Sequence, residues 1–171
     1  MQDWLTLDRR PTLVFGAGGL GGACALSLAG QGARVALVDV NQDKLDAVVR
    51  AAKEAGCEIK PLVADLRTAE ACRAAVREGV ELVGTPQVFL HAIGRNERKA
   101  ILDLGDADWE DTLSLNLSSA YWLGQAVGRL MVEQRYGRMV FVSSVSGLLA
   151  HPHHGPYAAT KGGMNQMLRV M

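Results

Sequence analysis

Cysteine is scarce in this sequence, and a net charge is absent. The three cysteines, Cys24, Cys57 and Cys72, lie far apart and match neither the spacing of a zinc site nor a disulfide framework. We therefore expect a protein of a reducing compartment, the cytoplasm. Lys plus Arg and Asp plus Glu both number 18, so there is no basic surplus to hold nucleic acid. These absences argue against a disulfide-stapled domain and against a nucleic-acid partner.

Long apolar runs are missing as well. No stretch approaches the roughly 18 consecutive apolar residues of a membrane-spanning helix. The first eleven residues carry an acid at Asp3 and lack the apolar core of a signal peptide. The sequence does contain an ordinary globular composition, with 171 residues of which 49% are hydrophobic and 21% charged. No repeat or linker divides it, so we expect residues 1–171 to form a single domain without a membrane partner.

Short apolar runs alternate with helical segments along the chain. The expected strands are 12–15, 34–39, 59–64, 88–91 and 138–142. The expected helices are 23–29, 41–55, 68–82 with Thr68 as cap, 106–135, and one that begins near 157. Alternation of this kind is typical of a parallel sheet with helices on both faces. We expect an α/β fold with a doubly wound, Rossmann-like parallel sheet in three layers.

Glycines follow the first expected strand directly. Gly16, Gly18 and Gly21 fit the pattern G-x-G-x-x-G, and Gly16, Gly19 and Gly22 fit a related spacing. Glycines between a strand and a helix let the backbone approach a pyrophosphate, which then sits on the helix N-terminus. Glycine-rich turns also arise for packing alone, but the strand–turn–helix context favours a dinucleotide site.

Asp39 ends the second expected strand, 23 residues after Gly16. This is close to the separation of about 20 residues expected for an acid that binds the ribose hydroxyls of adenosine. No Arg or Lys occurs in the glycine turn, and Val40 and Asn41 follow the acid. Because a 2′-phosphate would meet a carboxylate without a counter-charge, we expect NAD rather than NADP. The alternative is that Asp39 only caps the next helix.

The expected helix 106–135 contains one polar residue close to its apolar stripe. Asp106 is the expected N-cap. The residues at helical spacing that we expect in the core are Trp109, Leu113, Leu117 and Ala120. Asn116 lies near this stripe, where its amide must be hydrogen-bonded to avoid a cost in stability. The residue is either a satisfied structural group or one that positions a water.

A serine, a tyrosine and a lysine follow the fifth expected strand. Tyr157 and Lys161 are four residues apart in an expected helix, which puts the phenol and the ammonium on one face. An ammonium beside a phenol favours the phenolate, and Ser144 could share the hydrogen bonding to a substrate oxygen. Such a set can move a proton to or from an alcohol or a carbonyl. Taken alone, Tyr-x-x-x-Lys is equally well explained as a surface pair.

Together, and in this order, these features resemble the short-chain dehydrogenase/reductase family. The resemblance runs from about residue 8 to the last residue. The positions that carry it are the glycine turn, Asp39, Ala64-Asp65-Leu66, Asn116, Ser144, Tyr157 and Lys161. Several motifs in the family's order are far more specific than any one of them.

The resemblance implies a role for each catalytic residue. Tyr157 would be the general acid/base, and Ser144 would orient the substrate oxygen. Lys161 would promote the phenolate and bind the nicotinamide ribose, while Asn116 would hold a water in the proton relay. Hydride would pass directly between the nicotinamide and the substrate carbon, so no metal is expected.

The resemblance also implies a cofactor site, in which Asp65 would contact adenine. The residues expected at the cofactor are Gly16, Gly18, Gly19, Leu20, Gly21, Asp39, Asp65, Leu66, Ala92, Gly94, Tyr157 and Lys161. The sequence departs from the family pattern at Phe15, usually Thr, and at Leu20, usually Gly. His91 stands where the family usually has the first Asn of Asn-Asn-Ala-Gly, and we expect it to supply a hydrogen-bonding group there.

Two loops suggest the kind of substrate. The segments 94–99 and 156–163 are similar to those of gluconate 5-dehydrogenase and related sugar-acid or polyol enzymes, and 3-oxoacyl carrier-protein reductases share most of the same residues. Arg98 would pair with a substrate carboxylate, or else be a solvated loop charge. His151, His153 and His154 lie where the family builds its substrate rim. Because no Cys or carboxylate accompanies them, we expect substrate contact by His151 and His154, or plain exposure, rather than a metal.

Met171 follows Tyr157 by only fourteen residues, whereas family members continue for another strand or two. We expect the sheet to end at its fifth strand, with the C-terminal part of the family fold missing. One predicted function is an NAD-dependent oxidoreductase acting on a secondary alcohol or ketone, such as a sugar acid or polyol. The alternatives are a catalytically silent or truncated dinucleotide-binding module and, at the level of substrate, a 3-oxoacyl carrier-protein reductase. A full-length form is expected to be a homodimer or homotetramer.

Overall fold

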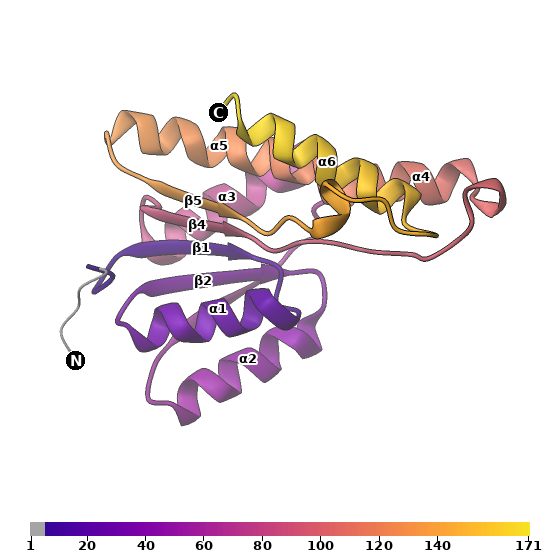
Figure 1. Ribbon diagram of the computed structural model, residues 1–171. Helices are drawn as coiled ribbons and strands as arrows, with labels where there is room; N and C mark the ends of the chain where they lie inside the picture. The colour runs from indigo at the N-terminus through magenta and orange to yellow at the C-terminus, as the bar shows by residue number, and fades with distance from the viewer. Residues whose placement is uncertain (1–5) are drawn as a thin grey trace.

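The structure, a computed structural model, describes residues 6–171, and the expectation drawn from Asp3 lies outside this range. Residues 6–171 form a sheet of five parallel strands in the order β3-β2-β1-β4-β5 (Figure 1). The strands are β1 (Pro11–Phe15), β2 (Arg34–Asp39), β3 (Ile59–Val63), β4 (Val88–His91) and β5 (Arg138–Phe141). Each begins and ends within one residue of its predicted range.

Helices cover both faces of this sheet. They are α1 (Gly19–Gly30), α2 (Gln42–Glu54), α3 (Ala69–Val83), α4 (Asp106–Leu113), α5 (Ser119–Glu133) and α6 (Gly155–Leu168), with short 3-10 turns η1 (Ile101–Asp103) and η3 (Val145–Gly147). Helices α1 and α2 lie on one face, and α3, α5 and α6 on the other (Figure 1). The predicted doubly wound α/β fold of three layers is confirmed. Over residues 6–171, no helix is both long and apolar enough to cross a membrane.

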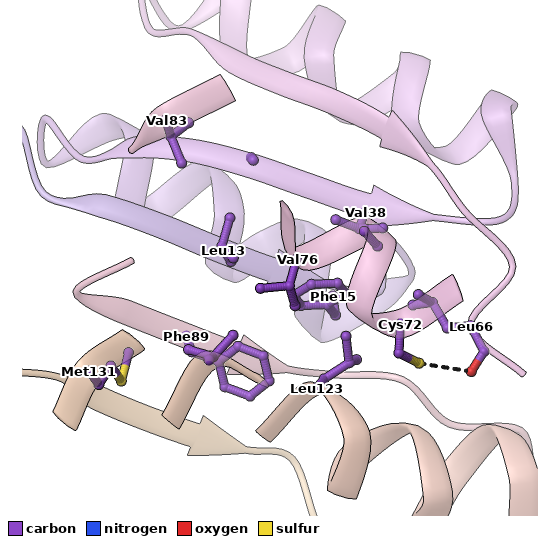
Figure 2. Close-up of a cluster of buried hydrophobic side chains, with 13 residues drawn as sticks. Leu13, Phe15, Val38, Leu66, Cys72, Val76, Val83, Phe89, Leu123 and Met131 are labelled. Atoms are coloured by element: carbon purple, nitrogen blue, oxygen red, sulfur yellow. Dashed lines mark hydrogen bonds between the residues drawn. The ribbon is translucent and has the colours of Figure 1, made fainter. Parts of the chain in front are cut away.

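Alternate residues of the central strands supply two separate cores. Phe15 of β1 and Phe89 of β4 point toward α3 and α5, where Figure 2 shows them beside Val76 and Leu123. The intervening residues, such as Val14, pack on the opposite face against α1 and α2. Burial on both faces explains why the strands appear in the sequence as continuous apolar runs.

Cys72 belongs to the first of these cores. Its side chain is fully buried, and its Sγ donates a hydrogen bond to the Leu66 carbonyl at 3.3 Å (Figure 2). Burial raises the pKa of this thiol to about 12, so it remains protonated and unreactive at neutral pH. Cys24 and Cys57 are half-buried and also unpaired.

The starts of α2 and α3 agree with the prediction, and those of α1 and α4 depart from it. Asn41 caps α2 by accepting a hydrogen bond from the Lys44 amide, and Thr68 caps α3 as predicted. Helix α1 begins at Gly19, inside the glycine turn, rather than at the predicted residue 23. The N-cap of α4 is Gly105 and not Asp106.

The predicted helix 106–135 contains a π-helical stretch, η2 (Ser114–Ser118), between α4 and α5. The prediction that Trp109 lies in the core is wrong, because 41% of its surface is exposed. Over residues 109–120, the stretch for which the core stripe was predicted, the buried residues are Thr112, Asn116, Ser119 and Ala120. A π turn adds a residue to one helical turn and shifts the buried face. As a result, polar side chains occupy much of the stripe for which apolar core residues were predicted.

Candidate active site

The carboxyl ends of the parallel strands surround a cavity of about 490 Å³. It lies beyond the ends of β1 and β4, which are neighbours in the sheet. The chain continues from β1 to one side of the sheet and from β4 to the other, and ligands usually bind at such a point in doubly wound sheets. The predicted cofactor residues that line it are Gly16, Gly18, Leu20, Asp39, Asp65, Leu66, Ala92 and Gly94.

The glycines of the turn divide into two kinds. A Cβ on Gly16, whose φ is +103°, would lie 2.9 Å from the Ala92 carbonyl oxygen, and one on Gly21 would lie 1.9 Å from the Gly16 oxygen. A Cβ on Gly19 would meet nothing within 4 Å, and one on Gly18 would meet only Lys44 Nζ at 3.8 Å. Packing therefore requires Gly16 and Gly21. At Gly18 and Gly19 bare backbone faces open space at the start of α1, and this cradle fits a pyrophosphate.

The crowding at Gly16 and the open space at Gly30 predict opposite effects on stability for alanine substitutions at these two positions. Gly16→Ala should lower the free energy of unfolding by about 1–3 kcal/mol, because φ is positive and the carbonyl of Ala92 blocks the methyl group. Gly30→Ala, at the exposed last residue of α1, should raise it by up to about 1 kcal/mol. Urea denaturation measures both. Equal effects of the two substitutions would contradict this account of the turn.

Asp39 holds the glycine turn against the end of β2. One carboxylate oxygen accepts a hydrogen bond from the Ala17 amide at 2.7 Å, and the other accepts one from the Asn41 amide at 2.9 Å. Because Asn41 is the cap of α2, the alternative that Asp39 only caps this helix is wrong. The carboxylate also borders the cavity.

Three cations that the sequence analysis did not assign also line the cavity. They are Lys44, Arg67 and Arg95. Arg67 pairs with Asp65 and Asp111, while Arg95 pairs with Asp111 and Glu97. Only the fold could identify them, because each is one of many charged residues on a helix or loop in the sequence.

His91 is buried at the end of β4 and bonds to a helix. Its Nε2 lies 3.1 Å from Ser119 Oγ, and the Ser119 hydroxyl donates to the Leu115 carbonyl. Nε2 must therefore be the donor and Nδ1 an acceptor, and Nδ1 has no hydrogen-bond partner within residues 6–171. Burial lowers the pKa of His91 to about 3, with a further contribution from the charge of Lys161. The expected hydrogen-bonding group is present, and it joins β4 to α5.

Lys161 is buried where α6 crosses the ends of β4 and β5. Its Nζ donates to the Val142 carbonyl at 2.7 Å and to the Ile93 carbonyl at 3.4 Å, and it lies 5.8 Å from the centre of the Tyr157 ring. Burial lowers the pKa of Lys161 to about 8. A Cβ on Gly94 would lie 3.6 Å from Lys161 Nζ and 4.0 Å from the Tyr157 ring. Gly94 borders the cavity, so the tyrosine and the lysine meet at its edge.

Asn116 is buried in η2, and both polar atoms of its side-chain amide are hydrogen-bonded. Oδ1 accepts from the Arg95 amide, while Nδ2 donates to the Arg95 carbonyl and to Thr160 Oγ1. Thr160 in turn donates to the Tyr157 carbonyl at 2.7 Å. The hydrogen bonds that the structural alternative requires are present, and the positioning of a water by Asn116 stays a prediction. It joins the loop after β4 to the helix that carries Tyr157.

Ser144 precedes η3, and its Oγ accepts a hydrogen bond from the Ser146 amide at 3.1 Å. This contact leaves the hydroxyl hydrogen available to donate. The sequence analysis did not single out Ser146. Its Oγ lies 3.2 Å from Nδ1 of His151 and 3.2 Å from Nδ1 of His154. The His154 ring meets the Tyr157 ring edge-on at 5.9 Å.

Arg98 is exposed on the loop after β4, and its positive charge acts on His154. Burial lowers the pKa of His154, and the charges of Arg98, His151 and His153 lower it further. Of the three predicted substrate residues, His154 thus contacts Tyr157, His151 lies beside His154 with ring centres 5.6 Å apart, and Arg98 is near enough for its charge to act on His154. No group of three or more His, Cys, Asp or Glu in the described part of the chain is arranged to hold a metal ion.

Comparison with known sequences gives relatives with dehydrogenase and reductase activities. A probable galactose dehydrogenase of Rhizobium meliloti is 34% identical over 92% of this chain and 62% of its own length. Gluconate 5-dehydrogenase of Gluconobacter oxydans is 30% identical over 99% of this chain and 66% of its own. A 3-oxoacyl carrier-protein reductase of Thermotoga maritima is 28% identical, with coverages of 97% and 68%. The chain thus spans about two thirds of the length of these relatives.

Solved structures agree with the sequence relatives and include complexes with both nicotinamide cofactors. An NAD⁺-bound xylitol dehydrogenase superposes with a TM-score of 0.90 at 29% identity, covering 96% of this chain and 64% of its own. A metagenomic short-chain oxidoreductase in complex with NADP gives 0.91 at 28% identity, with coverages of 96% and 75%. The family described as short chain dehydrogenase matches residues 11–171. This chain belongs to the short-chain dehydrogenase/reductase family, whose members are oxidoreductases that bind nicotinamide dinucleotides.

Proposed function

We propose that this chain carries the cofactor-binding and proton-transfer parts of an NAD-dependent oxidoreductase that interconverts a secondary alcohol and a ketone. The supporting observation is the meeting of Tyr157 and Lys161 at Gly94, on the edge of the cavity. A module that only bound a dinucleotide would need the cavity, but it would not need an ammonium buried beside a phenol. Burying a charge is costly, so its retention favours a chemical role.

The cavity fits a dinucleotide in two places. The open backbone at Gly18 and Gly19 suits a pyrophosphate, and Asp39 offers a carboxylate, already held by two amides, to ribose hydroxyls. Asp39 supports NAD over NADP, since it would repel a 2′-phosphate. The cofactor, when bound, supplies hydride transfer to or from the substrate carbon.

The protein's own residues manage the proton. In the oxidation direction, the Tyr157 oxygen accepts the proton of the substrate hydroxyl, and in reduction it returns that proton to the carbonyl oxygen. The Lys161 ammonium lies beside the Tyr157 ring, and the carbonyls of Ile93 and Val142 that it contacts hold it in place. The free hydroxyl hydrogen of Ser144 is donated to the substrate oxygen. Asn116 acts through Thr160, which holds the backbone of Tyr157.

The region beside Tyr157 suits a substrate with a negatively charged group. Arg98, His151 and His154 would place positive or polarisable groups around a carboxylate, and this favours a sugar acid over a neutral polyol. A carrier-protein-bound 3-oxoacyl chain is the rival substrate. The unpaired cysteines suit the cytoplasm, and a homodimer or homotetramer is the proposed assembly of the whole protein.

A titration with NADH, followed by its fluorescence, tests the proposal. The chain should bind NADH, and Asp39→Asn should weaken binding about tenfold or more through the loss of charge-assisted hydrogen bonds. Asp43→Asn, in the first turn of α2, is the matched control and should leave the dissociation constant within about twofold. Polyols and sugar acids should then be oxidised with formation of NADH. Binding without turnover of any alcohol would favour the silent module, and no binding at all would refute the proposed cofactor site.

A further inference from the structure

A buried serine lies between two histidines beside the candidate active site. Ser146, in η3, is 6% exposed, and its Oγ lies 3.2 Å from Nδ1 of His151 and 3.2 Å from Nδ1 of His154. The centres of the two rings are 5.6 Å apart, and the His154 ring meets the Tyr157 ring edge-on. A single hydroxyl therefore contacts both imidazoles next to the proposed general acid/base.

The hydrogen-bonding capacity of this hydroxyl makes the two rings inequivalent. A serine hydroxyl has one hydrogen to donate, and a neutral imidazole carries one hydrogen, on either Nδ1 or Nε2. Within residues 6–171 the Ser146 Oγ has no other hydrogen-bond partner, so its hydrogen goes to one of the two Nδ1 atoms. The contact with the other ring is then a hydrogen bond only when that ring carries its own hydrogen on Nδ1. Burial and nearby positive charges lower the pKa of His154, which favours its neutral form. In the neutral state the two rings thus have opposite tautomers.

Opposite tautomers provide one hydrogen-bond donor and one acceptor. The ring that accepts from Ser146 has its hydrogen on Nε2, whereas the ring that donates to Ser146 has a lone pair on Nε2. No hydrogen bond within residues 6–171 uses either Nε2. His151 is exposed, and the Nε2 of His154 is not among the buried unpaired atoms of the described chain. Both nitrogens can therefore meet a ligand.

This pair suits one of the two candidate substrate classes better than the other. Adjacent hydroxyls of a polyol or sugar acid can each donate and accept, so two of them can satisfy the donor and the acceptor together. A 3-oxoacyl chain has carbonyl acceptors beside its reacting carbon but no hydroxyl, and it would leave the lone pair of the second ring unpaired. A polar atom left unpaired in a complex lowers affinity. The pair thus favours a polyhydroxylated substrate.

We propose that Ser146 is a positioning residue that fixes opposite tautomers in His151 and His154, so that the two rings bind adjacent hydroxyls of a polyhydroxylated substrate. The substrate part rests on the proposed function, whereas the tautomers are a property of the folded chain alone. Ser146→Ala tests both parts, because it removes the hydroxyl and keeps the backbone amide that donates to Ser144 Oγ.

Long-range ¹⁵N–¹H correlation spectra of the histidine side chains, recorded at pH 8 where histidine is ordinarily neutral, measure the tautomers. The two rings, identified by their absence in His151→Gln and His154→Gln, should show one Nδ1–H and one Nε2–H form. In Ser146→Ala both should adopt the Nε2–H form, which a neutral imidazole prefers when nothing binds Nδ1. Ser143→Ala is the matched control, because the Ser143 hydroxyl bonds to Asn165 instead, and it should leave both tautomers unchanged.

The same spectra, recorded in the presence of NADH, test the substrate. NADH cannot accept a hydride, so no alcohol is oxidised during the titration. Gluconate and xylitol should shift the Nε2 resonances of both rings, whereas 2-butanol, which has no second hydroxyl, should shift neither. Ser146→Ala should weaken the binding of gluconate and xylitol about tenfold, as expected when one hydrogen bond is lost.

The outcomes separate this proposal from the proposed function. It is overturned if both rings of the wild type have the same tautomer, if Ser146→Ala changes neither, or if gluconate and xylitol shift neither ring. Opposite tautomers without binding of NADH would refute the proposed cofactor site, and the same titration without NADH would then decide the substrate part. Shifts of both rings without oxidation of any alcohol would support this proposal and refute the proposed activity. Matching urea denaturation of the two serine variants verifies that both are folded.

Discussion

Replacing Tyr157 by Phe is expected to reduce the oxidation of a secondary alcohol by about 10²- to 10⁴-fold, the usual contribution of a general acid/base. NADH binding should stay within about twofold. The substitution removes only the phenol oxygen. The ring therefore keeps its edge-on contact with His154 and its position beside the Lys161 ammonium and Gly94. The loss should therefore appear in the chemical step and not in folding or cofactor affinity.

The matched control for this substitution is Tyr136→Phe. Tyr136 lies just before β5, at the opposite end of the strands, where Arg10 and Arg138 lie over its ring at 4.6 and 5.0 Å. Its hydroxyl has no place in the proposed chemistry, so turnover should be unchanged. Single-turnover rates with excess enzyme isolate the step that the substitution affects. If Tyr157→Phe binds NADH normally and still oxidises the alcohol at the wild-type rate, Tyr157 is not the general acid/base.

Acidification is expected to destabilise the fold through His91. Its pKa is about 3 in the folded chain against an ordinary value of 6.5, because burial opposes the charged ring. Between these values the unfolded chain binds a proton that the folded chain does not. The resulting stability is fully present above pH 6.5 and is lost as the pH falls toward 3. Between pH 7 and pH 4, His91 alone should cost about 3 kcal/mol of unfolding free energy.

The measurement is the free energy of unfolding in urea at several pH values, for the wild type and for two variants. His91→Asn retains an amide that can reach toward Ser119 but has no group that titrates, so its stability should fall less steeply between pH 7 and pH 4. His153→Gln removes an exposed loop histidine and should follow the wild type. Parallel curves for all three proteins would show that the buried imidazole does not control acid stability. Carboxylates titrate alike in all three, and the comparison cancels their contribution.

The strands and the order of the site residues were predicted well from the sequence. Strand residues such as Val14 and Phe15 are buried on opposite faces of the sheet, so their apolar runs are unbroken and easy to recognise. The glycine turn and Asp39 could be found because a strand–turn–helix unit imposes a nearly constant spacing. The exposure of Trp109 was missed, because a π-helical stretch changes which side of a helix faces the core, and the apolar spacing of the sequence contains no sign of it.

The motifs and apolar patterns of the sequence were thus enough to predict the alternation of strands and helices, the resemblance to the family, and the residues at the ends of the strands. Contacts between distant segments were decided only by the tertiary structure. Folding brings Ser119 to His91 across 28 residues and Asn116 to Thr160 across 44. It also turns Lys44 back over Gly18 and leaves it without a carboxylate partner among residues 6–171. The physical reason is that sequence patterns report periodicity and burial within one element, whereas partners in hydrogen bonds and ion pairs depend on how elements pack.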